Sequence, residues 1–505
     1  MKIALVRVPT TIDSSASTAP ICPPIGMAYL HTICLRHTSD IAIIDSIGNY
    51  TGTRAIKGDH HDFELLGQDK REIAAQIDPD TDLVLISIMF SQDWPYSKEL
   101  LSEIRSRCAS AKIVAGGEHV TAVPEFSLRS SPDLDLIVVG EGEASLDGIL
   151  STFGETGALP TDEPGTVYLL DGEYVDNSRR PRIKEVDSIP RPNWDGFPLA
   201  NYLDNGHGFG ATRGGRSMPI LASRGCPYQC TFCSSPLMWT TAWKSRDPKD
   251  VLDEMEGYIS RYQVTNFDFY DLTAIVKKEW IVEFTKMLIE RKLNVTWQLP
   301  SGTRSEAIDD EVAPLLYESG CRNLSYAPES GSPAVLKMIK KKVDLGRMLE
   351  SMKCCSTNKM SVKVNLICGF PKERIQHLLQ TLPFICKLAW VGCDDMSINQ
   401  FSPYPGSELF DDLTKADLVT LDEDYFQALS FYSSMTNARS YSEKLTSKQI
   451  IAFKFVGTTL FYSLNFLFHP SKMFRTMINV RNKNDTTRLE KTLISYLGRG
   501  KVALD

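Results

Sequence analysis

Three cysteines with the spacing of metal ligands stand out among the chemically reactive residues. Cys226, Cys230 and Cys233 lie in the segment CPYQCTFC, at a Cys-x3-Cys-x2-Cys spacing. Thiolates are soft ligands that select zinc or iron–sulfur clusters. A structural zinc site needs a fourth ligand, yet His207 lies 19 residues before Cys226 and Cys321 lies 88 residues after Cys233. The spacing therefore predicts that the three thiolates ligate an iron–sulfur cluster and leave one iron open.

Composition excludes several classes of protein. The chain has 505 residues, of which 42% are apolar and 23% are charged, and its net charge is −8. This mix is typical of globular domains and excludes collagenous and disordered chains. The 12 cysteines are too sparse for a disulfide scaffold. No basic tail is present, so we expect no nucleic-acid partner.

Residues 1–154 are predicted to form a doubly wound α/β domain. Continuous apolar runs alternate with helix-like stretches, a pattern that is typical of a parallel sheet buried on both faces. The expected strands are Lys2–Val8, Asp40–Asp45, Asp82–Ile88, Lys112–Ala115 and Leu134–Val139. Glycine-rich loops follow several of these strands, at the sheet edge where ligands bind in such folds.

The rest of the chain divides into three parts. Residues 155–215 are rich in proline and are predicted to form a linker with a small hairpin that turns at Asp171-Gly172. Residues 216–410 resume strand–helix alternation at about 30 residues per unit, which predicts a full or partial (β/α) barrel. Residues 411–505 are predicted to be mainly helical.

The cysteine segment SRGCPYQCTFCSSP resembles the signature of the radical S-adenosylmethionine (radical SAM) superfamily. That resemblance implies a [4Fe-4S] cluster whose open iron is chelated by SAM, and reductive cleavage of SAM to a 5′-deoxyadenosyl radical. Four later segments, beginning at Trp297, Ala327, Gly369 and Phe401, resemble the family's other motifs in the expected order. The residues implied to bind SAM are Phe232, Ser301, Arg304, Glu329, Ser330 and Gly369. Many relatives carry two successive acids after the strand at 267–270, whereas here Asp271 is followed by leucine.

The segments PPIGMAYL, IIDSIG, ISIMF, GGEHVTAVPE and VVGEGE resemble the cobalamin-binding domain that precedes the barrel in the B12-dependent radical SAM subfamily. The residues implied to contact cobalamin are Pro24, Ile25, Gly26, Ser87, Met89, Gly116, Gly117, His119, Gly140, Glu141 and Gly142. An Asp-x-His-x-x-Gly loop, whose histidine ligates cobalt in many B12 proteins, is missing, because the string from Asp59 carries Glu64 where glycine should stand. We therefore expect cobalamin without a protein histidine ligand.

The resemblance implies a cobalamin-dependent radical SAM enzyme, first of all a C-methyltransferase that acts on a small-molecule or lipid-like substrate. A second hypothesis keeps the cofactors but replaces methylation by oxidative cyclisation or rearrangement. A third is a non-catalytic iron–sulfur protein. The sequence singles out no catalytic side chain beyond the cofactor ligands. The family also implies a reducing partner such as flavodoxin or ferredoxin.

The location of the protein follows from its thiols and its apolar runs. The N-terminus lacks the long apolar stretch of a signal peptide, and we expect a cytoplasmic protein with reduced thiols. No run of about 18 apolar residues occurs, so no transmembrane span is predicted. The nearest approach is Phe455–Phe468, which is predicted to be either a buried helix or an apolar surface for a lipid-like substrate or membrane.

Overall fold

The computed structural model describes residues 1–14, 21–57, 62–178, 180–211, 213, 215–303 and 307–499. Five parallel strands, in the order β3-β1-β6-β7-β8, form the centre of the N-terminal sheet. They are β1 (Ile3–Arg7), β3 (Ile41–Asp45), β6 (Leu83–Ser87), β7 (Lys112–Gly116) and β8 (Leu136–Val138). This order is that of a flavodoxin-like doubly wound sheet, so the predicted fold of this part is confirmed.

Both faces of this sheet are buried because successive strand residues point to opposite sides. Ile3 and Leu5 pack on one side, with α1 (Ile25–Cys34) and α7 (Gly142–Thr156). Ala4 and Val6 pack on the other side, with α3 (Lys70–Ala75) and α4 (Trp94–Arg107). The helices on both faces explain why the strands are apolar throughout.

Antiparallel strands extend the N-terminal half. The predicted hairpin is present as β9 (Thr166–Leu170) and β10 (Glu173–Asp176), and both Asp171 and Gly172 have positive φ, as a tight hairpin turn requires. β9 pairs with β8, so the hairpin belongs to the N-terminal sheet. A separate sheet joins β2 (Thr10–Asp13), β5 (Asp62–Leu66) and β4 (Thr53–Lys57), which the sequence pattern did not predict.

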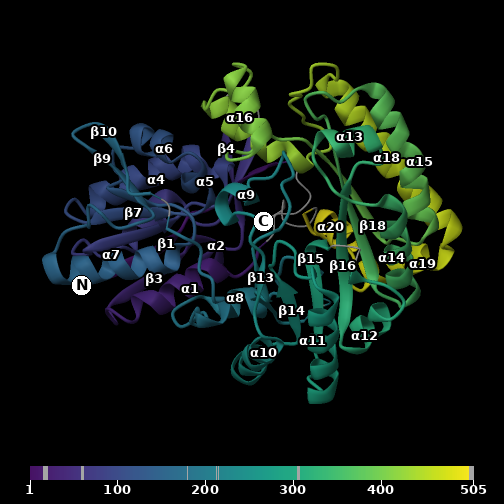
Figure 1. Ribbon diagram of the computed structural model, residues 1–505, viewed down its shortest axis with the longest axis horizontal. Helices are drawn as coiled ribbons and strands as arrows, with labels where there is room; N and C mark the ends of the chain where they lie inside the picture. The colour runs from purple at the N-terminus through teal and green to yellow at the C-terminus, as the bar shows by residue number, and fades with distance from the viewer. Residues whose placement is uncertain are drawn as a thin grey trace.

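Six parallel strands form the second sheet, in the order β11-β14-β15-β16-β17-β18. They are β11 (Ser217–Ile220), β14 (Asn266–Phe269), β15 (Thr296–Thr303), β16 (Cys321–Glu329), β17 (Ser361–Cys368) and β18 (Asp395–Gln400). Helices α10 (Pro248–Tyr262), α11 (Lys278–Arg291), α12 (Val312–Glu318), α14 (Leu345–Thr357) and α15 (Ile375–Trp390) alternate with them. The described edge strands β11 and β18 do not pair with each other, so the barrel is partial (Figure 1).

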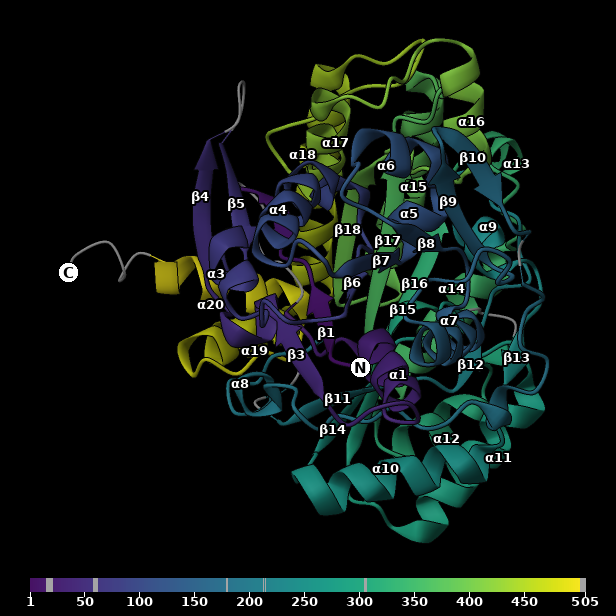
Figure 2. The same cartoon turned by 90° about the vertical axis from the view of Figure 1, so that its left-hand side faces the viewer.

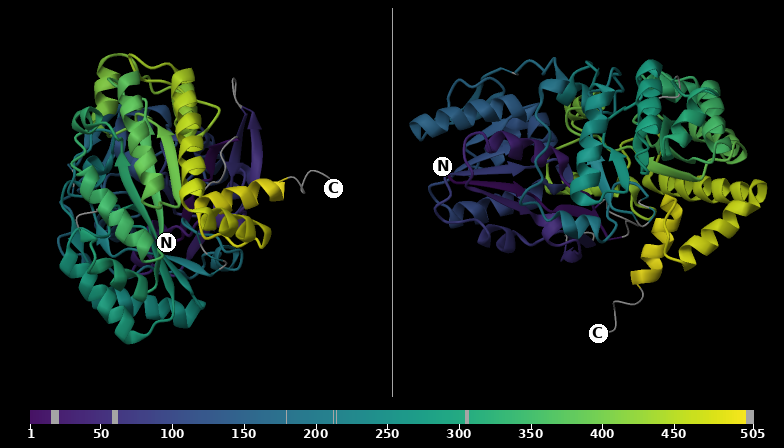
Figure 3. Two further views of the ribbon diagram at one scale, coloured as in Figure 1. Left: turned by 90° about the vertical axis from the view of Figure 1, so that its right-hand side faces the viewer. Right: turned by 90° about the horizontal axis from the view of Figure 1, so that it is seen from below.

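The C-terminal part is helical, as predicted. Its helices are α16 (Glu408–Lys415), α17 (Glu423–Leu429), α18 (Ser447–Phe468), α19 (Pro470–Arg481) and α20 (Arg488–Arg499). Helix α18 packs along α15 and β18 on the outside of the barrel, and α19 and α20 follow it (Figure 3).

Helix α18 contains the apolar run that begins at Phe455. It is long and apolar enough to cross a membrane by length and composition alone, and one third of its most apolar window is buried against the rest of the protein. Phe453 and Phe461 lie in the core, whereas Phe455 and Leu467 are exposed. One face of this run therefore packs as a core helix and the other is an apolar surface, whose contact with a lipid-like substrate or membrane stays a prediction.

Candidate active site

The three candidate cluster ligands lie in one loop between β12 (Ser223–Arg224) and α9 (Ser235–Trp239). All three are partly exposed. The loop begins at Gly225, whose positive φ and close approach to the carbonyl of Ala242 leave no room for a side chain. At its other end the amide of Cys233 donates to the carbonyl of Cys230 over 3.1 Å.

The donor chemistry of this loop fits an iron–sulfur cluster. In the part of the chain that the structure describes, no three His, Cys, Asp or Glu side chains converge on a point that would hold a single ion. Thiolates that bind separate irons of a cluster do not need to converge in that way, unlike the ligands of one zinc ion. Burial raises the pKa of the Cys233 thiol to about 11, and a bound metal would favour its deprotonation.

A buried ion-pair network fixes the start of the cysteine loop to the N-terminal domain. Arg224 donates to Glu143 over 2.6 Å and to Glu141 over 3.2 Å. Arg182 donates to the other oxygen of Glu141 over 3.2 Å. The carboxylate of Glu141 is thus engaged by two arginines, and its predicted contact with cobalamin stays a prediction. Sequence reasoning missed both arginines, because nothing in their spacing links them to Glu141.

The predicted SAM residues Glu329, Ser330 and Gly369 lie at the carboxyl ends of β16 and β17. Glu329 is buried with a positive φ of 67° and binds Lys341 over 2.9 Å. Burial raises the pKa of this carboxyl. Gly369 begins a turn, and its amide donates to the carboxylate of Glu373 over 2.6 Å. Glu373 is buried, and burial raises the pKa of its carboxyl to about 7. These polar groups form a strand-end platform beside the cysteine loop, where a polar cofactor could be held.

An aromatic chain joins the cysteine loop to this platform. The ring of Phe232 lies 5.7 Å from that of Phe370, which lies 5.3 Å from that of Phe401.

Of the other two predicted SAM residues, Ser301 lies partly buried in β15 and Arg304 lies outside the described residues.

Asp271 is hydrogen-bonded to neighbouring residues, although it is followed by leucine and not by the second acid that many relatives carry. Its carboxylate accepts hydrogen bonds from the hydroxyl of Ser223 over 2.5 Å and from the amide of Ala222 over 3.1 Å. Burial raises its pKa to about 6. Asp271 thus positions the strand that leads into the cysteine loop.

The predicted cobalamin residues gather at one edge of the N-terminal sheet, apart from His119. Pro24 precedes α1, and Ile25 and Gly26 begin it. Ser87 ends β6, Gly116 ends β7 and Gly142 begins α7. Met89 is exposed at this edge, and Gly140 follows β8. Gly117 has a φ of 119°, and a Cβ there would lie 2.4 Å from the carbonyl oxygen of Ile88. The carboxyl ends of the strands therefore form the expected rim. Figure 2 shows the N-terminal sheet in front of the barrel strands.

His119 lies below this rim rather than on it. It is 1% exposed, its Nδ1 lies 2.9 Å from the hydroxyl of Ser91, and its ring lies 4.8 Å from that of Trp94. Burial lowers its pKa to about 3, so the imidazole is neutral at physiological pH. Its Nε2 is buried without a hydrogen-bond partner among the described residues. The segment Asp59–His61, which sequence reasoning examined for a cobalt ligand, lies outside the described residues.

The rim and the cysteine loop open onto one cavity of about 390 Å³. Met89, Phe90 and Glu118 line it from the N-terminal domain, and Ser234, next to Cys233, lines it from the cysteine loop. The hydroxyl of Ser234 donates to the carboxyl of Glu118, so the cysteine loop and the N-terminal domain are in direct contact. The remaining walls are Thr10, Thr11, Ile12, Asp13, Ser91, Gln92, Phe209, Tyr404, Pro405, Ser430, Tyr432 and Ser433.

Comparison with known proteins identifies the family. The Radical SAM superfamily model matches residues 220–385 and the B12 binding domain model matches residues 15–150. The chain therefore belongs to the radical SAM superfamily and carries a B12 binding domain ahead of the radical SAM domain. The resemblance found in the sequence is thus confirmed.

Relatives along most of the chain include two named as methyltransferases and one named as a cyclase. An "uncharacterized methyltransferase" from Pyrococcus horikoshii is 28% identical over 81% of this chain and 83% of its own length. The cytidylyl-2-hydroxyethylphosphonate methyltransferase of Streptomyces wedmorensis is 25% identical over 80% of each chain. The anaerobic magnesium-protoporphyrin IX monomethyl ester cyclase of Cereibacter sphaeroides is also 25% identical, over 82% of this chain and 64% of its own.

Solved structures share the fold. The radical SAM methyltransferase TsrM from Kitasatospora setae, solved with cobalamin and a [4Fe-4S] cluster, has a TM-score of 0.66 at 14% identity, over 90% of this chain and 91% of its own. The cobalamin-dependent radical SAM enzyme OxsB has a TM-score of 0.68 at 15% identity, over 99% of this chain and 71% of its own. Both the N-terminal sheet and the partial barrel thus have counterparts in these structures.

Proposed function

We propose that this protein is a cobalamin-dependent radical SAM enzyme that methylates a carbon atom of a small molecule. The observation that carries the proposal is the shared cavity, onto which the cysteine loop and the rim of the N-terminal sheet both open. Relatives named as methyltransferases support the transfer of a methyl group. The substrate itself is not identified by these relatives.

In this proposal each cofactor has a set of residues on the chain. Cys226, Cys230 and Cys233 hold the [4Fe-4S] cluster, and the platform at Glu329 and Gly369 holds SAM. Phe232, Ser301 and Ser330 are proposed to contribute to the same SAM site, and Arg304, which lies outside the described residues, stays a prediction. The rim residues, from Pro24 to Gly142, hold cobalamin. Gly117 allows the close approach of the rim loop, because no Cβ fits there.

When bound, the cluster and SAM supply a carbon-centred radical, and cobalamin supplies a transferable methyl group. The chain's own residues arrange these groups and exclude water. Phe90, Phe209 and Tyr404 supply apolar walls that shield reactive species from solvent. The contact between Ser234 and Glu118 ties the cysteine loop to the rim, so that the two cofactor sites keep a fixed separation.

Oxidative cyclisation or rearrangement is a second candidate, and the similarity to the Cereibacter sphaeroides cyclase favours it. The two functions differ in their products. Methylation adds one CH2 unit from one SAM to the substrate and yields S-adenosylhomocysteine, together with 5′-deoxyadenosine and methionine from the SAM that supplies the radical. Cyclisation yields 5′-deoxyadenosine without methyl transfer.

The test uses anaerobically purified protein, reconstituted with iron, sulfide and cobalamin and then reduced. We expect a corrin absorption band, cleavage of SAM and, in extracts of the source cells, a metabolite that gains one CH2 unit. Cys226→Ala abolishes SAM cleavage, whereas Cys321→Ala, a buried cysteine outside the loop, keeps it. A reduced protein that binds no corrin and cleaves no SAM would support the non-catalytic iron–sulfur hypothesis instead.

The proposal extends to partners and location. Reduction of the cluster requires an electron donor, for which a flavodoxin or ferredoxin is the natural class. The three cluster thiols must stay reduced to bind iron, which supports a cytoplasmic location. We also propose functional divisions at 1–154, 155–215, 216–410 and 411–505, with the hairpin of the second part attached to the first.

A further inference from the structure

A second cavity of about 160 Å³ lies within the barrel, away from the cysteine loop. Its walls come from the first halves of β16, β17 and β18, from the middle of β15 and from the start of α20. It shares Phe209 and Tyr432 with the larger cavity, so the two cavities adjoin. A molecule that reacts in the larger cavity could therefore extend one end into the smaller one.

The inner face of the barrel is polar at this point. Along β17, the fully buried Val362 and Val364 alternate with Ser361, Lys363 and Asn365, which are only partly buried. Ser361 and Lys363 line the cavity. Because side chains alternate in a strand, this pattern places the polar set in the barrel interior and the valines against the surrounding helices. A barrel that only needed filling would carry branched apolar residues there.

Lys363 brings an amine with no hydrogen-bond partner among the described residues into this interior. Its ammonium forms no hydrogen bond or ion pair with any described residue within contact distance, although Asp395 lies near enough to act on it through space. Burial, followed by repulsion from Arg488, lowers the pKa of Lys363 to about 7. Lys363 is only partly buried and lines the cavity, where a bound anion would supply the opposite charge and favour the protonated amine.

Two further cations come from α20 and line the same cavity, namely Arg488 and Lys491. The ammonium of Lys491 is directed by the carbonyl oxygens of Gly208 and Gly210, at 3.4 and 3.3 Å. Carbonyl groups hold this cation in place but do not neutralise it.

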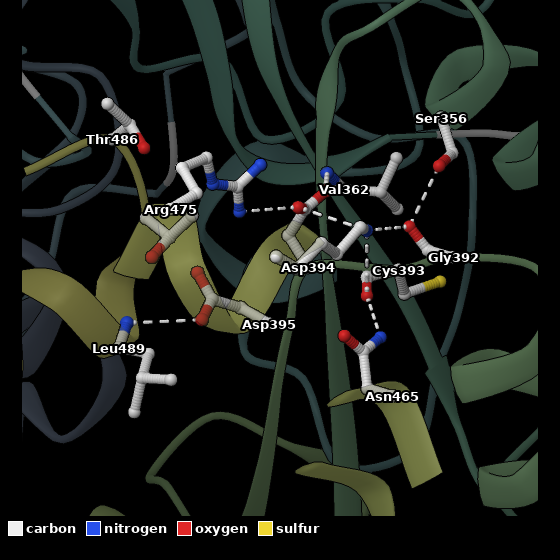
Figure 4. Close-up of polar contacts among 12 residues, drawn as sticks. Ser356, Val362, Gly392, Cys393, Asp394, Asp395, Asn465, Arg475, Thr486 and Leu489 are labelled. Carbon is white, nitrogen blue, oxygen red and sulfur yellow. Dashed lines mark hydrogen bonds and ion pairs between the residues drawn. The ribbon is translucent and has the colours of Figure 1, made fainter. Parts of the chain in front are cut away.

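The two acids in the neighbourhood already have donors. At the start of α20, Asp395 accepts the amide of Arg488 over 2.6 Å. It also accepts the amide of Leu489 over 3.1 Å (Figure 4). Asp268 accepts the amide of Phe209 over 2.9 Å and the side-chain amide of Gln298. Neither carboxylate forms an ion pair with one of the three lining cations in the described structure, so those cations stay available for an anion.

We propose that this cavity binds an oxyanion of the substrate, a carboxylate or a phosphoryl-type group, through Lys363, Lys491 and Arg488. The inference rests on the proposed function, and it names the substrate class as small and anionic rather than lipid-like at this end. The volume suits one such group with a short chain. The rest of the substrate passes Phe209 and Tyr432 toward the larger cavity.

Anion binding is tested on the anaerobically purified full-length protein without turnover. Thermal unfolding and titration calorimetry are recorded with inorganic phosphate and, separately, with acetate, at an ionic strength held constant with chloride. We expect one or both anions to raise the unfolding midpoint, since a ligand that binds only the folded state stabilises it. Phosphate alone points to a phosphoryl group, acetate alone to a carboxylate, and stabilisation by neither overturns the proposal.

Variants locate the bound anion. Lys363→Met and Lys491→Met should each weaken binding about tenfold or more, since a charged hydrogen bond is lost. Lys249→Met is the matched control, because Lys249 is 67% exposed and pairs with Asp253 on α10, and it should bind as the parent does. Without added anion, Lys363→Met should have an unfolding midpoint no lower than that of the parent. A lysine with only a structural role would lower the midpoint when it is replaced. If Lys363→Met does not fold, Lys491→Met and Lys363→Arg test the proposal instead. Anion binding should be lost in Lys491→Met and retained in Lys363→Arg.

Unchanged anion affinity in Lys491→Met, or in a folded Lys363→Met, would overturn the proposal. These readouts do not depend on SAM. Methyl transfer with no anion binding at this cavity would refute only the oxyanion site. Anion binding without SAM cleavage would refute only the proposed function.

Discussion

The arginine before the cysteine loop offers a sharp test of how the two halves of the protein are held together. Arg224 is 6% exposed and binds two carboxylates of the N-terminal domain, Glu141 and Glu143, which are 7% and 11% exposed. Replacing it by methionine in Arg224→Met keeps much of the side-chain volume but removes the charge. Glu143 then loses its ion-pair partner, whereas Glu141 keeps Arg182.

The magnitude follows from burial. Removing one partner of a buried ion pair costs about 3–5 kcal/mol, because the remaining charge is left without compensation. Because Glu141 stays paired with Arg182 and only Glu143 loses its partner, we expect a loss at the lower end of this range, about 3 kcal/mol in the free energy of unfolding. Arg261→Met is the matched control, because Arg261 and Asp195 form an ion pair that is 58% and 56% exposed. An exposed pair of this kind contributes at most about 1 kcal/mol.

The assay is urea-induced unfolding under anaerobic conditions, followed by tryptophan fluorescence, together with the iron content after reconstitution. Iron content should fall in Arg224→Met, because Cys226 lies two residues beyond the lost anchor. The double variant Arg224→Met, Glu143→Gln should regain part of the stability, since it removes the uncompensated charge. A free energy of unfolding within about 1 kcal/mol of the parent in Arg224→Met would refute the reasoning.

Three further predictions concern single residues of the site. Burial raises the pKa of Glu373 from 4.5 to about 7, so the folded state holds its proton more tightly, and the free energy of unfolding should fall by about 3 kcal/mol as pH rises from about 4.5 to about 7. In urea titrations across that pH range, the free energy of unfolding of Glu373→Gln should not fall in this way. An equal dependence on pH in both proteins would contradict the raised pKa of Glu373. Gly117→Ala should lower stability by about 1–3 kcal/mol and weaken cobalamin binding, measured by corrin absorbance, because of the positive φ and the carbonyl of Ile88. Gly154→Ala, near the end of α7 and with open space around its Cα, is the control and should do neither. Cys233→Ala should lose cluster iron and SAM cleavage while the apoprotein unfolds within about 1 kcal/mol of the parent, since the thiol makes no ion pair; retention of the full cluster absorbance would refute its role as a ligand.

Local pattern was sufficient for the class of fold and for the cysteine loop. Buried parallel strands must be apolar on both faces, so their positions are visible in the chain from Ile3 to Val138. The three cysteines lie within one segment, and contacts between near neighbours do not depend on the rest of the fold. The hairpin at Asp171-Gly172 was predicted for the same reason, because its turn needs two residues with positive φ.

Contacts between distant segments were decided by tertiary structure alone. The sheet β2-β5-β4, the arginine network at Arg224 and the position of His119 below the rim all join residues far apart in sequence. Nothing in the spacing of such residues encodes which of them will meet, because that depends on how the helices and sheets pack.

The sequence by itself determined that this protein carries a cluster-binding loop and a ligand-binding sheet, since each rests on local spacing and periodicity. Only the tertiary structure decided that both open onto one cavity, and that a polar barrel interior adjoins it. Lys363 illustrates the difference, because in the sequence it is one lysine among many. Its chemistry comes from the strand that turns it inward and from the helix α20 that brings two more cations to it.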